Sequence, residues 1–449
     1  MYIINYSLNK PVSSAPLVSF RIIFGAVMVF SAARFMVSGW IEDHFVDIQF
    51  TFKYTGFEWV ELLPPVWMYA IHVVMLLAAI GITIGLWYRV SAIVFFLSFT
   101  YVELIDLTWY LNHYYFVSLV SFLLIFVPAN TRLSVDAWRN PAIRRMLIPR
   151  WTVWIFKFQI AVVYISAGLA KIRYDWLINA LPLKIWVPAN SGLPIIGKLM
   201  AWKYSPWLFS WFGMLYDSFI VFFLSWKKTR MLAYLSVIVF HGLTGWMFQI
   251  GVFPLVMVGA TWIYFSEHFH EKLISFCERK LSFSVISDEQ LTIDVPKKRF
   301  IIHRSSSILL YIFIAFQLLF PWRYLLYDGN LFWTERGYRF GWRVMLMEKA
   351  GTATFYVKDQ ESGREGIVDN REFLHPHQEK QMAMQPDMIL QFSHFLADHY
   401  NKEGVANPAV RAEVYVTLNG RPSRLLIDPN VHLSTLKGDE IYQYIQPRN

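Results

Sequence analysis

A group of polar and ionisable residues stands within, or at the ends of, long apolar stretches of this sequence. Its members are Glu103, Asp106, Asn112, His113, Lys171, Asp217, His241 and Arg323. Such groups are costly at membrane depth, so they usually line a functional cavity or pair with another polar group. The topology that the loop charges predict places all of them toward the same side of the membrane. We therefore predict that they gather in the outer half of one helical bundle and form its site.

Lys171 is the strongest candidate for chemistry in this group. It follows residues 164–170, an apolar helix-forming segment whose small residues permit close packing. A lysine deprived of water favours the neutral amine, which can accept a proton as a general base. The alternative is that Lys171 extends a charged head to the membrane surface, as interfacial lysines commonly do.

Two histidines, His113 and His241, could orient a substrate, transfer a proton or bind a metal. A single membrane histidine more often hydrogen-bonds a neighbouring helix. The sequence has no HxxxH spacing and no paired carboxylates beside these histidines, which a metal site would favour. It also offers no Ser-His-Asp or Cys-His arrangement. We therefore expect no metal at this site.

The composition indicates that these groups belong to a membrane protein. Of 449 residues, 56% are hydrophobic and only 16% are charged, which is far from the mixture of a soluble domain. Apolar runs of about 20 residues, the length that crosses a bilayer, recur along the chain. They fall near residues 17–38, 64–87, 90–110, 114–128, 151–171, 207–225, 231–250, 252–266 and 305–327. The fourth and eighth are short, and we predict about nine transmembrane helices.

The charges between the runs predict the orientation. With the N-terminus in the cytoplasm, the loops on that side carry Arg89, Arg132, Arg139, Arg144, Arg145, Arg150, Lys227, Lys228, Arg230, Lys297, Lys298, Arg299 and Arg304. The first loop on the other side is acidic instead, with Glu42, Asp43, Asp47, Glu58 and Glu61. The loop near residues 172–206 is mildly basic and is the one exception. The positive-inside rule otherwise accounts for this distribution and for the net charge of +9, so nucleic-acid binding has no support.

The sequence pattern changes after residue 328. Residues 352–358 and 412–418 alternate apolar and polar side chains as strands do, and Asn419-Gly420 is a hairpin-turn signal. Residues 385–400 have the periodicity of an amphipathic helix. The predicted fold is an α-helical polytopic membrane protein over residues 1–327, followed over 328–449 by a β-rich domain in a periplasm or lumen.

These residues resemble the vitamin K-dependent γ-glutamyl carboxylases. The stretch SAGLAKIRYDW at residues 166–176 is similar to the lysine-containing segment of that family. Further similar stretches follow in the same order: NHYY at 112–115, PAN at 128–130, SVD at 134–136, FH at 240–241, IGVF at 250–253, GYRFGW at 337–342, LNGR at 418–421 and IDP at 427–429. The chain looks like a bacterial-type member with a horizontally transferred transmembrane domain.

The resemblance implies a reaction and its cofactor. A neutral lysine, matched here by Lys171, would deprotonate reduced vitamin K, either phylloquinol or menaquinol. The quinol anion and O2 would yield a stronger base that removes a γ-proton from glutamate. The carbanion would capture CO2, and the quinone would leave as its epoxide. Asn112 and His113 match positions that hydrogen-bond the quinol oxygen, and His241 matches another pocket histidine.

The resemblance also implies a glutamate-containing protein or peptide as the partner, handled beside membrane lipid. Arg421 and Arg343 would hold it by charge-assisted hydrogen bonds, with Tyr338 and Trp342 of the GYRFGW stretch beside them. The other interpretation of these arginines is ordinary solvated surface. The single cysteine, Cys277, excludes an intrachain disulfide.

The sequence is also consistent with two other functions. The protein could oxidise the quinol to its epoxide without carboxylating glutamate, which measurement of both products would detect. It could also bind quinone or lipid without catalysis, as a transporter-like scaffold. Inverted repeats would favour a transporter, and none is visible in the sequence.

Overall fold

The computed structural model of the chain describes residues 7–248, 250–281 and 304–448. Seven helical segments within these ranges are long and apolar enough to cross a membrane. They are α2 (Ala15–Val37), α4 (Pro65–Ile84), α5 (Tyr88–Ile105), α8 (Trp151–Ala170), α12 (Ser205–Ser225), α13 (Arg230–Phe248) and the segment Ser307–Leu326. The last is built from α17 (Arg304–Leu319) and the 3-10 helix η4 (Phe320–Leu326).

Two further apolar helices are shorter, as the two short runs of the sequence predicted. One is α6 (Asn112–Phe126), and the other is Phe253–Tyr264, in which α14 (Phe253–Thr261) continues into the 3-10 turn η3 (Trp262–Tyr264). The prediction of a polytopic helical membrane protein is therefore confirmed.

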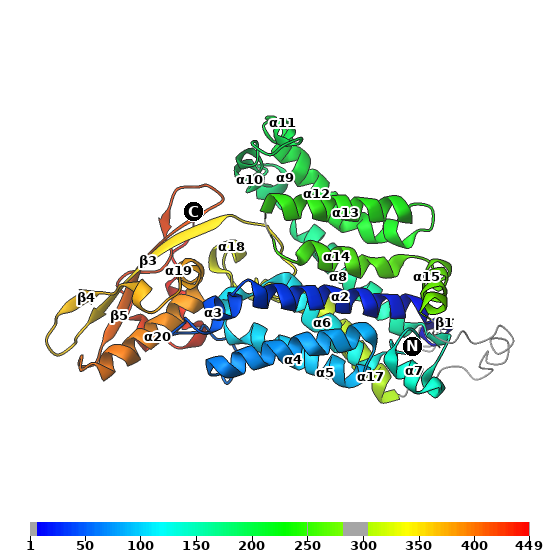
Figure 1. Cartoon of the computed structure of the whole chain (residues 1–449). Coiled ribbons are helices and arrows are strands. Elements are labelled where there is room, and N and C mark those ends of the chain that lie inside the picture. The colour runs from blue at the N-terminus through cyan, green and yellow to red at the C-terminus, as the bar shows by residue number, and fades with distance from the viewer. Residues whose placement is uncertain (1–6, 249, 282–303, 449) are drawn as a thin grey trace.

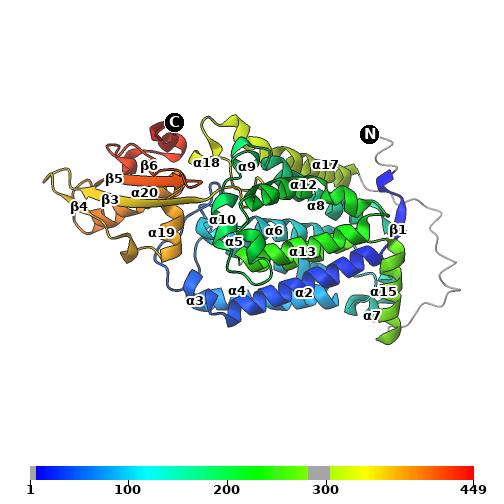
Figure 2. The same cartoon turned by 90° about the horizontal axis from the view of Figure 1, so that it is seen from above.

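The long helices run side by side as one bundle, which Figures 1 and 2 show from two directions. Neighbours in sequence pack as pairs, α2 on α4, α4 on α5, α8 on α12 and α13 on α14. Phenylalanines from different helices fill the core: the rings of Phe20 and Phe156 lie 4.8 Å apart, and Phe24 meets Phe95 edge-on. Burial of such large apolar side chains between helices specifies the arrangement.

One end of the bundle is closed by α15 (Glu267–Lys280), α7 (Val135–Arg139) and a ribbon of β1 (Pro11–Ser13) with β2 (Leu147–Pro149) (Figure 1). Arg132 pairs there with Glu271 at 2.7 Å and with Glu278 at 2.8 Å. Arg132 and Arg139, two of the arginines from which a cytoplasmic face is predicted, lie at this end of the bundle. Lys297, Lys298 and Arg299, which supported the same prediction, lie outside the described residues.

The C-terminal region forms a four-stranded antiparallel sheet at the opposite end of the bundle (Figures 1 and 2). Its order is β4 (Glu365–Ile367), β3 (Lys349–Lys358), β5 (Ala409–Leu418) and β6 (Arg424–Leu425). Both predicted strands and the hairpin turn are confirmed, because β5 turns into β6 through Asn419 and Gly420, each at positive φ.

Two helices pack against this sheet. They are α19 (Pro376–Met382) and α20 (Pro386–Lys402), and the second confirms the predicted amphipathic helix. Fully buried Phe392 of α20 meets Phe355 of β3 with ring centres 5.0 Å apart. This contact places the apolar face of the helix on the sheet, as its periodicity requires.

Segments that join the membrane helices contribute to the core of the C-terminal region. Phe52, Trp176 and Leu183 belong to the same buried cluster as Phe355 and Phe392. The sequence predicts a domain boundary between residues 327 and 328. The hydrophobic core of the C-terminal region nevertheless contains side chains from before that boundary as well as after it.

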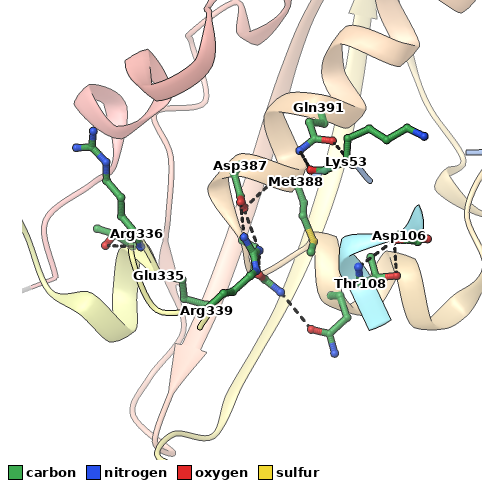
Figure 3. A network of polar contacts seen from close by, with 12 residues as sticks. Lys53, Asp106, Thr108, Glu335, Arg336, Arg339, Asp387, Met388 and Gln391 are labelled. Atoms are coloured by element: carbon green, nitrogen blue, oxygen red, sulfur yellow. Dashed lines mark hydrogen bonds and ion pairs between the residues drawn. The ribbon is translucent and has the colours of Figure 1, made fainter. Parts of the chain in front are cut away.

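Polar contacts hold this assembly together (Figure 3). The Lys53 backbone N–H donates to the Gln391 side chain at 2.7 Å, and the Gln378 amide donates to Asp106 at 2.6 Å. Because Asp106 also caps the 3-10 turn η1 (Leu107–Trp109) through Thr108, its carboxylate has a structural role. The sheet domain is therefore docked on the bundle by specific bonds as well as by apolar burial.

Candidate functional site

The first cavity lies between α8, α12, α13 and α14. Its volume is about 300 Å³, and aromatic and aliphatic side chains form most of its wall. The polar groups that line it include Lys171, Asp217, Tyr164 and His241. A mostly apolar cavity with a few polar groups on its wall is typical of small-molecule sites.

Lys171 and Asp217 form a buried ion pair on the wall of this cavity. The Lys171 Nζ atom lies 2.7 Å from Asp217 Oδ2, with 8% and 9% of the two side chains exposed. Lys171 ends α8 and Asp217 is on α12, so the pair depends on close packing of these helices. Gly168 permits this approach, because a Cβ atom there would lie only 2.5 Å from the backbone N of Ser218.

The lysine has two other neighbours. Its Nζ atom lies 3.3 Å from the carbonyl oxygen of Ala167 and 5.5 Å from the ring centre of Trp176. These contacts direct the head group along the end of α8 into the cavity. The structure thus places Lys171 inside the protein, whereas a lysine that extends to the membrane surface would be solvated.

His241 faces the same cavity from α13. Its Nε2 atom lies 2.7 Å from the Tyr164 hydroxyl, and its Nδ1 atom is buried without a partner among the described residues. A buried, unpartnered nitrogen is costly unless a ligand or water meets it. His241 therefore offers one ring atom for ligand binding.

A second cavity of about 640 Å³ contains the other two predicted catalytic residues. Asn112 and His113 begin α6 and line it together with His44, Glu103 and Arg34. The His113 Nε2 atom is buried without a partner among the residues that the structure describes. The Asn112 amide is already engaged, since it donates to the Arg343 carbonyl at 3.2 Å and accepts from the Tyr110 hydroxyl.

The two cavities share one wall. Ile250, Phe253, Val344 and Met345 line both of them. The ring centre of Phe253 lies 5.5 Å from that of His113 and 5.3 Å from that of His241. The four predicted catalytic residues are therefore brought together as two pairs, on either side of a thin apolar wall.

A strained loop supplies part of that wall. Phe340, Trp342 and Met345 all have positive φ values, between 52° and 58°. Non-glycine residues rarely adopt this conformation, and it persists where the surrounding packing demands it, often at functional sites. The loop carries the C-terminal region into the bundle, because Trp342 is fully buried there and stacks on Tyr115.

Sequence reasoning did not identify two residues of the second cavity, Arg34 and His44. Arg34, at the outer end of α2, lines the second cavity, and its guanidinium lies 4.6 Å from the ring centre of Trp40. No carboxylate among the described residues forms an ion pair with it. In the sequence, only the position of Arg34 near the end of the apolar run 17–38 indicated that it could belong to the site. Asp217 was recognised as polar, but its pairing with Lys171 depends on helix packing.

An aromatic stack connects the second cavity to the C-terminal region. His44, on the short helix α3 (Trp40–Phe45), lies with its ring centre 3.6 Å from Trp109, which lies 3.9 Å from His377 of α19. Burial, assisted by the nearby His377, lowers the pKa of His44 to about 4. His44 is therefore a neutral imidazole at physiological pH.

The predicted substrate-binding residues line neither cavity. Arg421 binds Asp175 through two nitrogens, at 2.5 and 2.8 Å, and this contact lowers the pKa of Asp175. Trp342 is in the bundle core, and the partly buried Tyr338 donates its hydroxyl to the Arg343 carbonyl. Their substrate roles stay predictions from the sequence. Arg343 lines a different, polar pocket.

Arg323 is the remaining member of the polar group that the sequence singled out. Arg323 donates to the backbone carbonyls of Phe320 and Arg339, which fixes the end of the last membrane segment. Within the described ranges, no group of three or more His, Cys, Asp or Glu side chains is placed to hold a metal ion.

Comparison with known protein families identifies both parts of the chain. Residues 9–269 match the HTTM domain, and residues 302–449 match the lumenal domain of vitamin K-dependent gamma-carboxylase. The two matches agree with the helical bundle and with the sheet region that docks on it. No solved structure matches the chain.

Proposed function

Because the chain belongs to the vitamin K-dependent gamma-carboxylase family, we propose that it carboxylates peptidyl glutamate with CO2 while it epoxidises reduced vitamin K with O2. It is a membrane protein with an extracytoplasmic domain, and we propose that its N-terminus is cytoplasmic. The observation that carries the proposal is the pair of adjoining cavities, with Lys171 and His241 in one and Asn112 and His113 in the other.

The first cavity suits a quinol. Its aromatic and aliphatic walls match a flat apolar ring that arrives through the bilayer, and its few polar groups match the ring oxygens. Reduced vitamin K would supply the oxidisable ring whose reaction with O2 drives proton removal from glutamate. His241 would orient it through the unpartnered Nδ1 atom, while the hydrogen bond to Tyr164 fixes the imidazole.

In this proposal Lys171 is the base that takes the quinol proton, and Asp217 acts with it. Since Lys171 Nζ donates to Asp217 Oδ2 at 2.7 Å, the amine can present a lone pair to the cavity only when that proton moves to Asp217 or leaves. The carboxylate can then receive and return one proton in each turnover. Burial of the pair away from water keeps this exchange local.

The second cavity suits the glutamate side chain. Arg34 supplies a guanidinium without an ion-pair partner among the described residues, and such a group binds carboxylates by charge-assisted hydrogen bonds. His113 offers a buried ring nitrogen on the same wall. We propose that Arg34 holds the substrate carboxylate, in place of Arg421, whose guanidinium is already bound to Asp175.

The experiment uses the purified full chain in lipid nanodiscs with reduced vitamin K, O2, labelled bicarbonate and a glutamate-rich peptide. Epoxide and acid-stable peptide label are measured in the same reaction. We expect both products, and we expect Lys171→Ala to lose both. Lys184→Ala is the matched control, because Lys184 is an exposed lysine over the Trp207 ring, outside both cavities. Full epoxidation by Lys171→Ala would remove this lysine as the base.

Arg34→Gln separates substrate binding from quinol chemistry. We expect it to leave epoxide formation intact and to raise the KM for the peptide about tenfold or more. Glu103 lines the same cavity, so the double variant with Glu103→Gln is the control. Restoration of the KM in the double variant would mean that Arg34 balances Glu103 and does not hold the substrate. Epoxide without peptide label from the wild-type chain would favour a quinol oxygenase.

A further inference from the structure

A third cavity of about 270 Å³ lies on the opposite side of the end of α8 from Lys171. It is formed by residues of α8, by Arg173, by Tyr324 of η4 and by the loop that contains Gly341 and Arg343. It shares no lining residue with the two cavities of the proposed active site. A ligand bound in it would therefore not reach Lys171.

Among the described residues, the charged groups that line this cavity are two arginines, Arg173 and Arg343. Arg343 is 5% exposed, and its buried Nε atom has no hydrogen-bond partner among the described residues. Its guanidinium lies 4.0 Å from the ring centre of Tyr324, and that of Arg173 lies 4.4 Å from the ring centre of Phe332. Neither arginine forms an ion pair with a described carboxylate.

Two cations in one partly buried pocket are costly without a counter-charge. Contact with an aromatic face compensates only part of the lost hydration of a guanidinium. The guanidinium group of each arginine carries N–H donors that can form two parallel hydrogen bonds with a phosphate or a carboxylate. An anion between Arg173 and Arg343 would satisfy the buried Nε atom and offset the repulsion between the two charges.

The rim of the cavity indicates where the anion comes from. Leu169, Ile172 and Trp322 line it and are 39%, 55% and 39% exposed, at the ends of two membrane segments. Apolar side chains and a tryptophan at that depth face lipid near the headgroup level. The volume is close to the lower limit of about 300 Å³ for small-molecule sites, which accommodates a headgroup.

We propose that this cavity binds the phosphate of an anionic phospholipid, from the leaflet that faces the C-terminal domain. The acyl chains lie along the exposed apolar rim, and the phosphate accepts hydrogen bonds from Arg173 and Arg343. Because the loop that carries Arg343 continues into the wall shared by the two active-site cavities at Val344 and Met345, a bound lipid also steadies that wall.

The test measures binding of phosphatidylglycerol to the delipidated full chain in detergent, by native mass spectrometry. We expect Arg343→Gln and Arg173→Gln each to weaken binding about tenfold or more. Arg424→Gln, an exposed arginine on β6 outside the cavity, should bind as the wild type does. Arg173 is less buried than Arg343, so its variant serves if Arg343→Gln fails to fold. Unchanged affinity in the folded arginine variants overturns the proposal.

Competition identifies the source of the anion. Inorganic phosphate and glycerol phosphate should displace the lipid only at far higher concentrations, because they lack the acyl chains that bury apolar surface. Equal displacement by inorganic phosphate would identify a site for free phosphate and contradict the lipid source. Displacement by the glutamate-rich peptide, lost in Arg343→Gln, would assign the cavity to substrate and also overturn the proposal.

Discussion

Replacement of Gly168 by alanine should impair catalysis without removing any group from the cavities. The added Cβ atom would lie 2.4 Å from Ser218 Oγ and 2.5 Å from Ser218 N. A side-chain hydroxyl can rotate away, but the backbone nitrogen can move only if α12 moves. The substitution must therefore push α8 and α12 apart at the level of the neighbouring Lys171–Asp217 pair.

The expected magnitudes follow from this geometry. Overpacking of a tight helix contact costs about 1–3 kcal/mol of unfolding free energy. The 2.7 Å contact between Lys171 and Asp217 would lengthen, since both residues lie within one helical turn of the clash. A displacement of about 1 Å at a reacting group can lower the rate about 100-fold. A 100-fold loss of rate corresponds to about 2.7 kcal/mol, which is comparable with the stability cost, so the rate must be compared on protein that is shown to be folded.

Epoxide formation and thermal unfolding should be measured on the same preparations. Gly242→Ala is the matched control, because Gly242 is also on a membrane helix, but beyond its chain neighbours and the backbone of its own helix no atom of the described residues lies within 4 Å of its added Cβ. We expect that control to keep full activity and to gain up to about 1 kcal/mol from helix propensity. Full epoxidation by a folded Gly168→Ala protein would refute the argument that close packing of α8 and α12 positions the lysine.

Three further predictions test the site and its docking. Asp217→Asn should lower epoxide formation about 100-fold or more, because the proton on Lys171 loses its acceptor, and single-turnover kinetics would check this. Phe253→Ala should raise the ratio of epoxide to carboxylated peptide, since it opens the wall between the cavities to water. Arg421 lowers the pKa of Asp175, so their contact should stabilise the protein above the ordinary Asp pKa of about 3.9 and be lost as pH falls through the lowered value. Unfolding measured against pH should show this component in the wild type and not in Asp175→Asn.

Much of the architecture could be predicted from local sequence. Run length and charge distribution indicate the membrane helices, including the two short ones, because crossing a bilayer requires an uninterrupted apolar segment. Alternation and the Asn419-Gly420 turn likewise predict the hairpin at the end of β5. These features depend on neighbours within a few residues, so no knowledge of packing is needed to infer them.

The composition of the site depends on packing, and the sequence leaves it open. Lys171 and Asp217 are separated by the whole loop between two helices, and only the close approach at Gly168 brings them to 2.7 Å. The sequence alone does not show that Arg421 has a partner, so it is a candidate for substrate binding. In the structure, the hairpin that carries Arg421 docks on the bundle and Arg421 forms an ion pair with Asp175.

By itself, the sequence determined that this protein is a helical membrane bundle with a β-containing extracytoplasmic region, and that a small group of polar residues lies in the bundle. The tertiary structure decided how that group is divided between two cavities, which cation faces each cavity and which polar residues serve docking. The physical reason is that apolar periodicity encodes which segments are buried, whereas the partner of a buried charge is set by helix contacts between distant segments.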